Sequence, residues 1–401
     1  MFDLFIRYFS FIVLLFSTFL SGQEKGQSLA IEIEPVFQVD RPAPTQDKPQ
    51  SKLWYAHGDW WVLLPDREGP SVWKRSQKVW KKDLELATDL SGLPGKADIY
   101  GNDGDVMAIL VGDCELEAIR LAYDGSSYHL QYRTRLSVPG TCSSVETATI
   151  ARDGNGIWWV ASDMDNGVMV WASEDGGRTW SLPIEMADGI DGDDISVISK
   201  LKGEVSVIWS NQEDESIRER THRDGDALEN WSPIQTIDKG GKTADDHLNT
   251  TLLSDGTLVL VSKNSLDELN EPQFVLRVRD GLGNWTNIPY ATLTNERHPT
   301  RPVVTHLPNG ECVALHTVGV PNDRPYISVV HISWDGSSVV VEEKIQVRAK
   351  DGSGINNVTV GKLDFLDAPS GPWITLFSDG QGRVYELDLY DYRQLFETGH
   401  P

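Results

Sequence analysis

The chain has 401 residues, of which 60 are Asp or Glu and only 36 are Lys or Arg, so its formal net charge at pH 7 is -24. Such acidity opposes binding to nucleic acid phosphates, whereas an acidic sugar remains an acceptable ligand where basic side chains line its site. Removal of residues 1–22 would delete one Asp and one Arg, so the charge would not change.

The first 22 residues differ in character from the rest of the chain. A mostly apolar stretch from Tyr8 to Leu20 is followed by the small residues Ser21 and Gly22. It is too short for a comfortable membrane span and is typical of the core of a signal peptide. We therefore expect residues 1–22 to be a signal peptide, with no stable membrane insertion, and the mature protein to be secreted or periplasmic. An uncleaved anchor is the alternative.

Residues 23–50 are predicted to form a closing strand and a linker. The segment from Leu29 to Glu34 alternates apolar and polar residues, which is typical of a half-buried β-strand. Pro42, Pro44 and Pro49 mark the following stretch as a linker. The last of the sequence repeats described below ends one strand short, after residues 383–389. We therefore expect the Leu29–Glu34 strand to pair there and close the ring that these repeats form.

A long repeat runs through residues 51–395. Seven glycines each precede a short run rich in Trp or β-branched residues, and they are spaced by 46, 52, 47, 53, 54 and 61 residues. A unit of four strands generates such a period, and radial stacking of these units buries both faces of each in a β-propeller. We predict an all-β, seven-bladed β-propeller of four-stranded blades. The glycines are Gly58, Gly104, Gly156, Gly203, Gly256, Gly310 and Gly371.

A second series of turns shares this period. Asp-Gly pairs begin at Asp124, Asp175, Asp224, Asp280 and Asp335, so each of these repeats carries two hairpin turns.

One of these turns carries a family resemblance. The segment from Ser173 to Trp180 matches the Asp-box S-x-D-x-G-x-T-W and resembles the sialidase, or BNR-repeat, superfamily. In this motif the Asp caps turn amides, the glycines take left-handed conformations and the Trp packs into the blade. Asp-boxes lie at the periphery of propellers, so the resemblance implies a fold and no particular activity. The chain is also similar to an uncharacterised group of exported BNR-repeat proteins in its segments D-D-I-S at 193–196, D-D-H-L-N at 245–249, K-N-S at 263–265 and T-R-P at 300–302.

Polar side chains recur where the innermost strands of successive blades are expected to begin. These beginnings meet at one mouth of the central channel, which the loops between second and third strands also reach, and convergent polar groups are what a ligand pocket needs. The strand beginnings carry Glu146, Asp193, Asp194, Asp245, Asp246, His247, Arg301, Asn356 and Asn357. The loops add Asp163, Asn211, Lys263, His316 and Arg324.

Three of these residues are candidate catalytic groups. Asp246 and His247 place a carboxylate beside an imidazole that titrates near neutral pH, and Asp194 is a further candidate acid. Arg301 precedes Pro302 and is expected on an extended backbone, which suits a guanidinium aimed at a carboxylate. We expect substrate binding by Arg301, Lys263, Glu146, Asp193, Asp245, Asn211, Asn357 and His316.

Each assignment has a structural alternative. The first Asp of each pair can cap a strand, Arg301 can bridge to Asp246, and Lys263 can be a solvated loop charge.

Two classes of function fit this mouth. The first is an enzyme acting on an acidic oligo- or polysaccharide, either a sialidase-like hydrolase or a uronate lyase in which His247 is the base and Arg301 and Lys263 neutralise the uronate carboxylate. A sialidase also needs a tyrosine paired with a glutamate, which we do not find at the right phase, and Tyr326 is the one weak candidate for the acid of a lyase. The second class is a non-catalytic glycan- or protein-binding propeller.

The remaining expectations concern cysteines, cofactors and assembly. Cys114 and Cys142 fall in one repeat and can pair across neighbouring strands, or they can remain buried thiols together with Cys312. We expect a monomer without a cofactor. Clustered aspartates could hold Ca²⁺, but no spaced ligand motif supports such a site.

Overall fold

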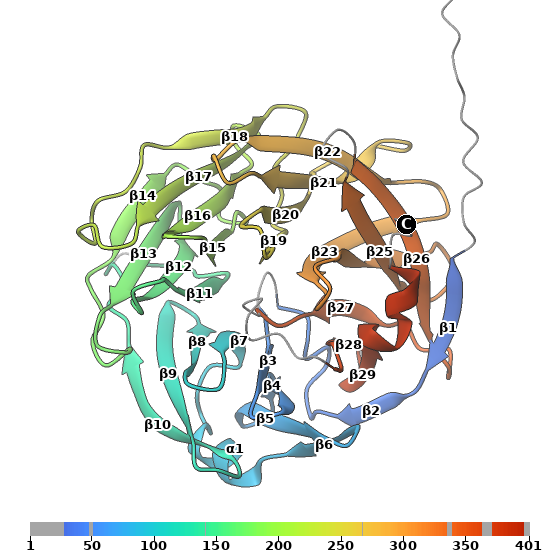
Figure 1. Cartoon of the computed structure of the whole chain (residues 1–401), viewed down its shortest axis with the longest axis horizontal. Helices are drawn as coiled ribbons and strands as arrows, with labels where there is room; N and C mark the ends of the chain where they lie inside the picture. The colour runs from blue at the N-terminus through green and yellow to red at the C-terminus, as the bar shows by residue number, and fades with distance from the viewer. Residues whose placement is uncertain are drawn as a thin grey trace, which may run out of the picture.

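A computed structural model describes residues 28–47, 51–140, 142–266, 268–334, 339–362 and 371–396. The predicted signal peptide lies outside these ranges. Seven sheets surround a common axis as the blades of a propeller (Figure 1). The predicted all-β, seven-bladed architecture is therefore confirmed.

Each blade is an antiparallel meander whose first strand lies nearest the axis and whose last strand lies at the rim. Blade 1 consists of β3 (Leu53–Ala56), β4 (Asp59–Asp66), β5 (Gly69–Ser76) and β6 (Val79–Lys82). Blade 2 consists of β7 (Lys96–Gly101), β8 (Val106–Gly112), β9 (Glu115–Tyr123) and β10 (Tyr128–Arg135). Blade 3 consists of β11 (Ala148–Arg152), β12 (Trp158–Met164), β13 (Gly167–Ser173) and β14 (Ile184–Asp188). Blade 4 consists of β15 (Ser196–Lys200), β16 (Glu204–Asn211), β17 (Ser216–Arg223) and β18 (Gln235–Lys239).

The last three blades follow the same order, and the N-terminal strands join two of them. Blade 5 consists of β19 (Leu248–Leu252), β20 (Leu258–Lys263), β21 (Pro272–Arg279) and β22 (Trp285–Thr292). Blade 6 consists of β23 (His298–His306), β24 (Cys312–Gly319), β25 (Tyr326–Trp334), β26 (Val339–Ala349) and the added β1 (Leu29–Ile33). Blade 7 consists of β27 (Asn356–Thr359), β28 (Ile374–Ser378), β29 (Arg383–Asp388) and β2 (Pro35–Gln38).

An N-terminal strand closes the ring as predicted, but a different segment does so. β2 pairs antiparallel with β29, whereas β1 pairs in parallel with β26 as a fifth strand of blade 6. The expectation that Leu29–Glu34 would pair beside residues 383–389 was therefore wrong. Phe37 of β2 stacks on Trp73 of blade 1 with ring centroids 4.4 Å apart. This aromatic contact gives β2 an anchor at the seam between blades 7 and 1.

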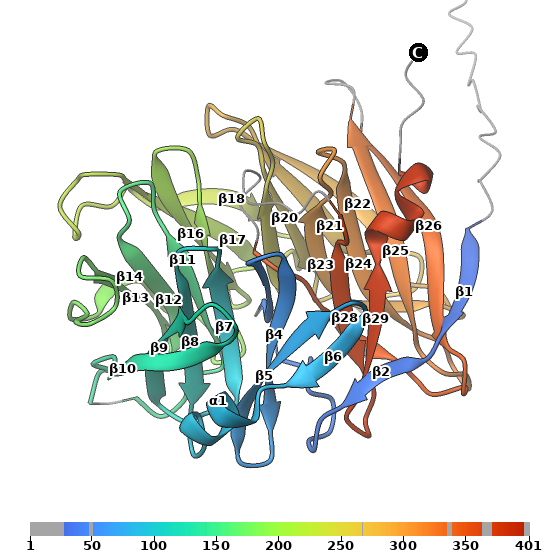
Figure 2. The ribbon, with the colours of Figure 1, turned by 60° about the horizontal axis from the view of Figure 1, so that its bottom comes forward.

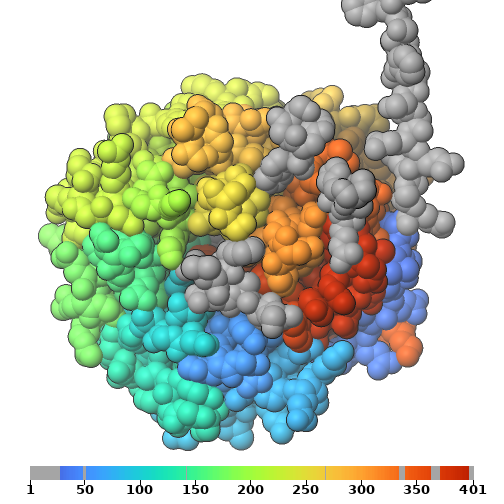
Figure 3. All heavy atoms as spheres, viewed as in Figure 1, coloured from blue at the N-terminus to red at the C-terminus, as the bar shows by residue number. Residues whose placement is uncertain are grey.

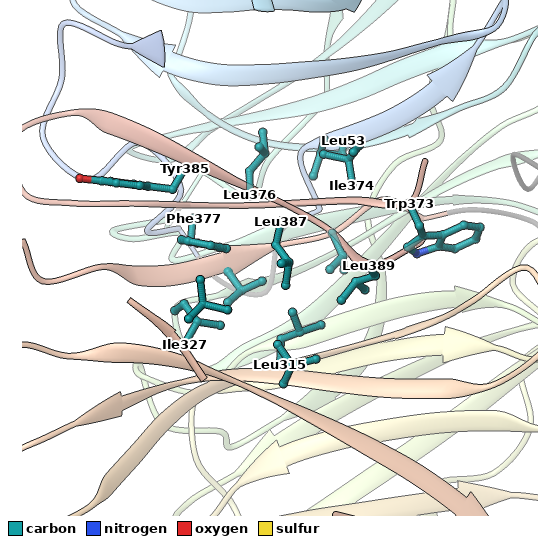
Figure 4. Packing of buried hydrophobic residues seen from close by; sticks show 14 of the residues in the cluster. Leu53, Leu315, Ile327, Trp373, Ile374, Leu376, Phe377, Tyr385, Leu387 and Leu389 are labelled. Carbon is teal, nitrogen blue, oxygen red and sulfur yellow. The ribbon is translucent and has the colours of Figure 1, made fainter. Parts of the chain in front are cut away.

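Apolar packing holds the seam together. One core cluster spans blades 6, 7 and 1 and includes Leu315, Ile327, Phe377, Leu387 and Leu53, each at most 2% exposed (Figure 4). Burial of a large apolar side chain contributes roughly 1.5–3 kcal/mol. In the space-filling view, blue N-terminal atoms lie directly against red C-terminal atoms (Figure 3). The two ends of the described chain are thus joined by side-chain packing as well as by strand pairing.

The Asp-box forms the turn between β13 and β14. Asp175 Oδ1 accepts hydrogen bonds from the backbone N–H groups of Arg178 at 3.0 Å and Thr179 at 2.9 Å. Gly176 and Gly177 both have positive φ, at +76° and +91°. Since a side chain at such φ values is strained, glycine is required here. The turn therefore has the chemistry that the motif predicts.

A buried ion pair between Asp98 and Lys362 connects the inner parts of several blades. The Asp98 carboxylate is fully buried and accepts hydrogen bonds from Ser51 N at 2.6 Å and Ile150 N at 2.7 Å. Lys362 Nζ pairs with the same carboxylate and donates to Ile150 O at 3.0 Å. Burial raises the pKa of Asp98, while Lys362 acts against that shift. These bonds tie blades 1, 2 and 3 to the chain that follows β27.

Two helical segments and one disulfide complete the described chain. α1 (Leu84–Asp89) and the 3-10 helix η2 (Leu389–Leu395) lie on opposite faces of the ring (Figure 2). Cys114 and Cys142 form a disulfide with Cα atoms 5.9 Å apart, and Cys312 is a buried thiol. Among the described residues, no helix is long and apolar enough to cross a membrane.

Candidate functional site

The site lies where the first strands of the blades begin. These beginnings share the face that carries α1, because α1 leads from the last strand of blade 1 towards the first strand of blade 2 (Figure 2). We call this end of the channel the mouth. Glu146, Asp193 and Asp246 precede the first strands of blades 3, 4 and 5, and one carboxylate oxygen of each lies within 4.8 Å of the others. Ionised carboxylates this close repel one another unless positive charge offsets them, and an oxygen-only set suits a hard cation such as Ca²⁺.

We call the carboxylates of Glu146, Asp193 and Asp246 the acidic wall. Beside the acidic wall, Asp245 links His247 to Lys263. Its carboxylate accepts hydrogen bonds from His247 Nδ1 at 2.8 Å and Lys263 Nζ at 2.6 Å, and Nδ1 also contacts Asp246. Burial opposes ionisation of Asp245, but the contacts with His247 and Lys263 outweigh it and hold the pKa of Asp245 below its usual value. Because Nδ1 is the donor in these contacts, the neutral imidazole carries its lone pair on Nε2. Asp245 therefore fixes the tautomer and orientation of the ring.

Arg301 reaches the mouth from blade 6 with a backbone that differs from the prediction. Its φ is +57°, in the left-handed region, rather than the extended value expected before Pro302. A β-bulge between Thr300 and Val303 interrupts the ladder of β23 and places Arg301 outside the regular pairing. Backbone conformations of this kind in non-glycine residues persist only where the surroundings enforce them, and they cluster at ligand sites.

The guanidinium of Arg301 lies within electrostatic range of several acids. Burial lowers the pKa of Arg301, whereas Asp47, Glu146 and Asp245 act in the opposite direction. Its Nη1 donates to the backbone oxygen of Gln46 at 3.2 Å. Among the described residues Arg301 makes no direct ion pair, so the alternative bridge to Asp246 is not formed. A guanidinium held by one carbonyl retains donors for a ligand carboxylate.

Blade 7 and the N-terminal segment close the remaining side of the pocket. Asn357, which has a φ of +60° at a bulge in β27, lines the same cavity as His247 and Arg301. Thr45, Gln46 and Asp47 also line this cavity, and its free volume of about 20 Å³ suffices for one water molecule. Thr45 is anchored by a 2.7 Å hydrogen bond between its Oγ1 and Ser378 Oγ. A larger ligand must approach over the pocket or displace this segment.

Two predicted site residues, Asp194 and Asn211, hold loops in place and do not line the pocket of His247 and Arg301. Asp194 is fully buried, and its carboxylate accepts hydrogen bonds from the backbone N–H groups of Asp191 at 2.8 Å and Gln212 at 3.0 Å. Burial raises the pKa of Asp194. Asn211 Nδ2 donates to Gly189 O at 2.9 Å. Both residues tie the segment before β15 to the loop after β16, and the structure does not bring Asp194 to the acidic wall.

His316 and Tyr326 also lie away from the pocket. His316 faces blade 5 and packs edge-on against Phe274 with ring centroids 5.0 Å apart. Burial lowers the pKa of His316 to about 3, so the ring is neutral at physiological pH. Tyr326 is 3% exposed beneath Arg348, whose guanidinium lies 4.6 Å from its ring centroid. Neither residue lines the cavity that contains His247 and Arg301.

Residues 45–47 form part of this pocket, and the sequence alone did not indicate it. Those residues carry no motif, and they reach the mouth because they follow β2, the strand that closes the ring and ends at Gln38. Asp163, which had been nominated as a loop residue, accepts hydrogen bonds from Glu146 N at 2.9 Å and Thr147 N at 3.1 Å. Burial raises the pKa of Asp163 to about 7. It positions the backbone that carries Glu146 into the acidic wall.

Comparisons with known proteins establish the fold alone. No protein-family model matches the chain, and no curated protein matches it. An ulvan lyase of polysaccharide lyase family PL25, solved with a bound glucuronate and sulfated rhamnose unit, superposes with a TM-score of 0.55 at 13% identity over 92% of this chain and 100% of its own. The polysaccharide lyase Uly1 gives 0.51 at 9% identity over 90% and 100%. A Trypanosoma rangeli sialidase in complex with sialic acid gives 0.47 at 9% identity over 76% and 60%.

Proposed function

We propose that this chain is an exported carbohydrate-active protein that cleaves an acidic polysaccharide by elimination at a uronate. The observation that carries this proposal is the single pocket lined by both His247 and Arg301, with Asp245 holding the imidazole. The full-length similarity to two polysaccharide lyases supports the same class of substrate. The disulfide supports export, because such bonds persist in oxidising compartments.

The chemistry requires a base next to a carboxylate-binding group. Nε2 of His247 would take the proton from the ring carbon adjacent to the uronate carboxylate, and the electron pair left behind would form a carbon–carbon double bond as the bond to the leaving glycosidic oxygen breaks. Arg301 and Lys263 would offset the charge that develops on the carboxylate. The departing oxygen would take its proton from water.

Sialidase-like hydrolysis fits the pocket less well. It needs a cluster of arginines for the substrate carboxylate, and Arg301 is the one arginine among the described residues that line the cavity. Glycan binding without catalysis is the second candidate function. It is favoured by the composition of that described lining, which contains no tyrosine to serve as a proton donor.

The test is a screen of uronate-containing polysaccharides against the purified mature protein. Elimination produces an unsaturated uronate, which ultraviolet absorbance and product mass both detect. The His247→Ala variant should lose this product, whereas His129→Ala on the exposed rim strand β10 should retain it. Products with an added water in place of the double bond would show hydrolysis instead. Binding without any product would establish the non-catalytic function and refute the elimination mechanism.

A further inference from the structure

A cleft separate from the mouth lies between blades 5 and 6. It has a volume of about 1170 Å³, and none of the residues that line the pocket of His247 and Arg301 contributes to it. Small-molecule sites typically occupy roughly 300–1,000 Å³, so this cleft has room for an oligosaccharide segment. Its walls are the end of β22, the segment 294–299 and one face of blade 6.

The strand pairing of blade 6 explains the composition of this face. His316 pairs with Ser328, and Val330 pairs with Glu343, so these four side chains share the sheet face that looks towards blade 5. Val330 belongs to the apolar cluster that packs blade 5 against blade 6. The cluster does not extend to the part of the seam occupied by His316, Ser328 and Glu343, and the seam remains open there.

Glu343 is the centre of the hydrogen bonding in the cleft. Its carboxylate accepts from Arg297 Nη2 at 2.5 Å, Ser328 Oγ at 2.5 Å and Gln346 Nε2 at 2.9 Å. The Arg297 and Glu343 side chains are 43% and 19% exposed, so both have polar atoms within reach of a ligand. These contacts hold the pKa of Glu343 below its usual value against the effect of burial. The carboxylate is therefore an ionised acceptor.

The floor of the cleft contains two further polar side chains. Tyr290 and His316 both pack on Phe274, with ring centroids 5.4 Å and 5.0 Å from its ring. The Tyr290 hydroxyl and His316 Nδ1 have no hydrogen-bond partner among the described residues. Buried polar atoms without a protein partner are rare and usually pair with water or a ligand.

We propose that the cleft between blades 5 and 6 is a second glycan-binding site that takes neutral sugar units. The lining acids Glu296, Glu342 and Glu343 outnumber Arg297, so an anionic ligand is disfavoured. The charged and hydroxyl groups suit sugar hydroxyls, while the exposed Val340 and the half-buried Val341 present apolar surface to the C–H faces of sugar rings. This site does not depend on the chemistry of the mouth. It would hold an uncharged stretch of a polysaccharide chain.

Calorimetric titration with neutral tetrasaccharides of glucose and of xylose tests this proposal. Wild type should bind at least one of them. Glu343→Gln should weaken that binding by roughly tenfold, because it replaces an ionised hydrogen-bond acceptor with a neutral side chain of similar size. Val341→Trp should obstruct the sugar-binding surface of the cleft and abolish binding. Leu282→Trp, in the exposed turn between β21 and β22, is the matched control and should bind as wild type does.

The outcomes also separate the cleft from the mouth. The Arg301→Ala variant should lose the processing of acidic glycans and keep the affinity for the neutral tetrasaccharide. Loss of neutral binding in Arg301→Ala would place the ligand at the mouth and overturn the proposal. Unchanged affinity in Val341→Trp, or no binding by folded wild type, would overturn it as well. Failure of the elimination assay alone would leave the second site standing.

Discussion

The Arg301→Ala variant tests whether Arg301 has a functional or a structural role. In the folded protein this substitution removes one hydrogen bond of 3.2 Å to the Gln46 carbonyl. Removal of a typical hydrogen bond costs about 0.5–1.5 kcal/mol, and no buried acid is deprived of a direct ionic partner among the described residues. The left-handed φ of +57° remains unfavourable for Ala, so relief of strain does not offset this cost. We expect the free energy of unfolding to fall by about 1 kcal/mol.

The expected effect on activity is much larger. A positioned donor that stabilises charge developing on the substrate is worth roughly 10²–10³-fold in rate. Turnover of a uronate polysaccharide should therefore fall by at least about 100-fold in Arg301→Ala. The two measurements are chemical denaturation, for the free energy of unfolding, and absorbance of the unsaturated product, for the rate.

Arg277→Ala is the matched control. Arg277 is fully buried in β21, and its Nη2 donates to Asp238 of blade 4 at 2.9 Å. Loss of one partner of a buried ion pair costs about 3–5 kcal/mol, so this variant should be strongly destabilised. The refuting result is an Arg301→Ala protein that is destabilised as much as Arg277→Ala while its turnover per folded molecule matches wild type. Arg301 would then be a structural residue.

Two further predictions concern stability. Reduction of the Cys114–Cys142 disulfide, which spans 28 residues, should lower the free energy of unfolding by roughly 3 kcal/mol. Denaturation with and without reductant measures this, and identical curves would contradict it. Burial lowers the pKa of His316 from 6.5 to about 3, so as the pH falls the unfolded chain binds a proton at His316 before the folded protein does. The free energy of unfolding should therefore decrease as the pH drops from 6.5 towards 3, by up to about 5 kcal/mol. His316→Gln should have a flatter acid profile, and a profile parallel to that of wild type would refute this account.

The blade count and the hairpin turns could be predicted from the sequence because they depend on nearby residues. Each turn requires a glycine or an Asp within a few positions, and the period of the repeat counts the turns directly. Asp175 and Gly177 form the predicted turn because the backbone amides and side chains that hold it belong to the same hairpin.

The position of the acidic wall was also predictable, since equivalent positions of a radial repeat meet at one mouth. Glu146, Asp193 and Asp246 come together for this reason. The orientation of a single side chain within that region was not predictable. Asp193 and Asp194 are adjacent in sequence, yet the turn conformation directs Asp193 to the wall and buries Asp194 against backbone amides.

Contacts between distant segments were decided only by the tertiary structure. The alternation in Leu29–Glu34 predicts a strand but cannot select its partner, and the stacking of Phe37 on Trp73 favours β2 at the closing edge of blade 7. The hydrogen bond from Arg301 to the Gln46 carbonyl, 255 residues away in sequence, likewise depends on the closure of the ring. Local turn chemistry is written in neighbouring residues, whereas ring closure and the shape of the pocket depend on packing between segments hundreds of residues apart, which no local pattern records.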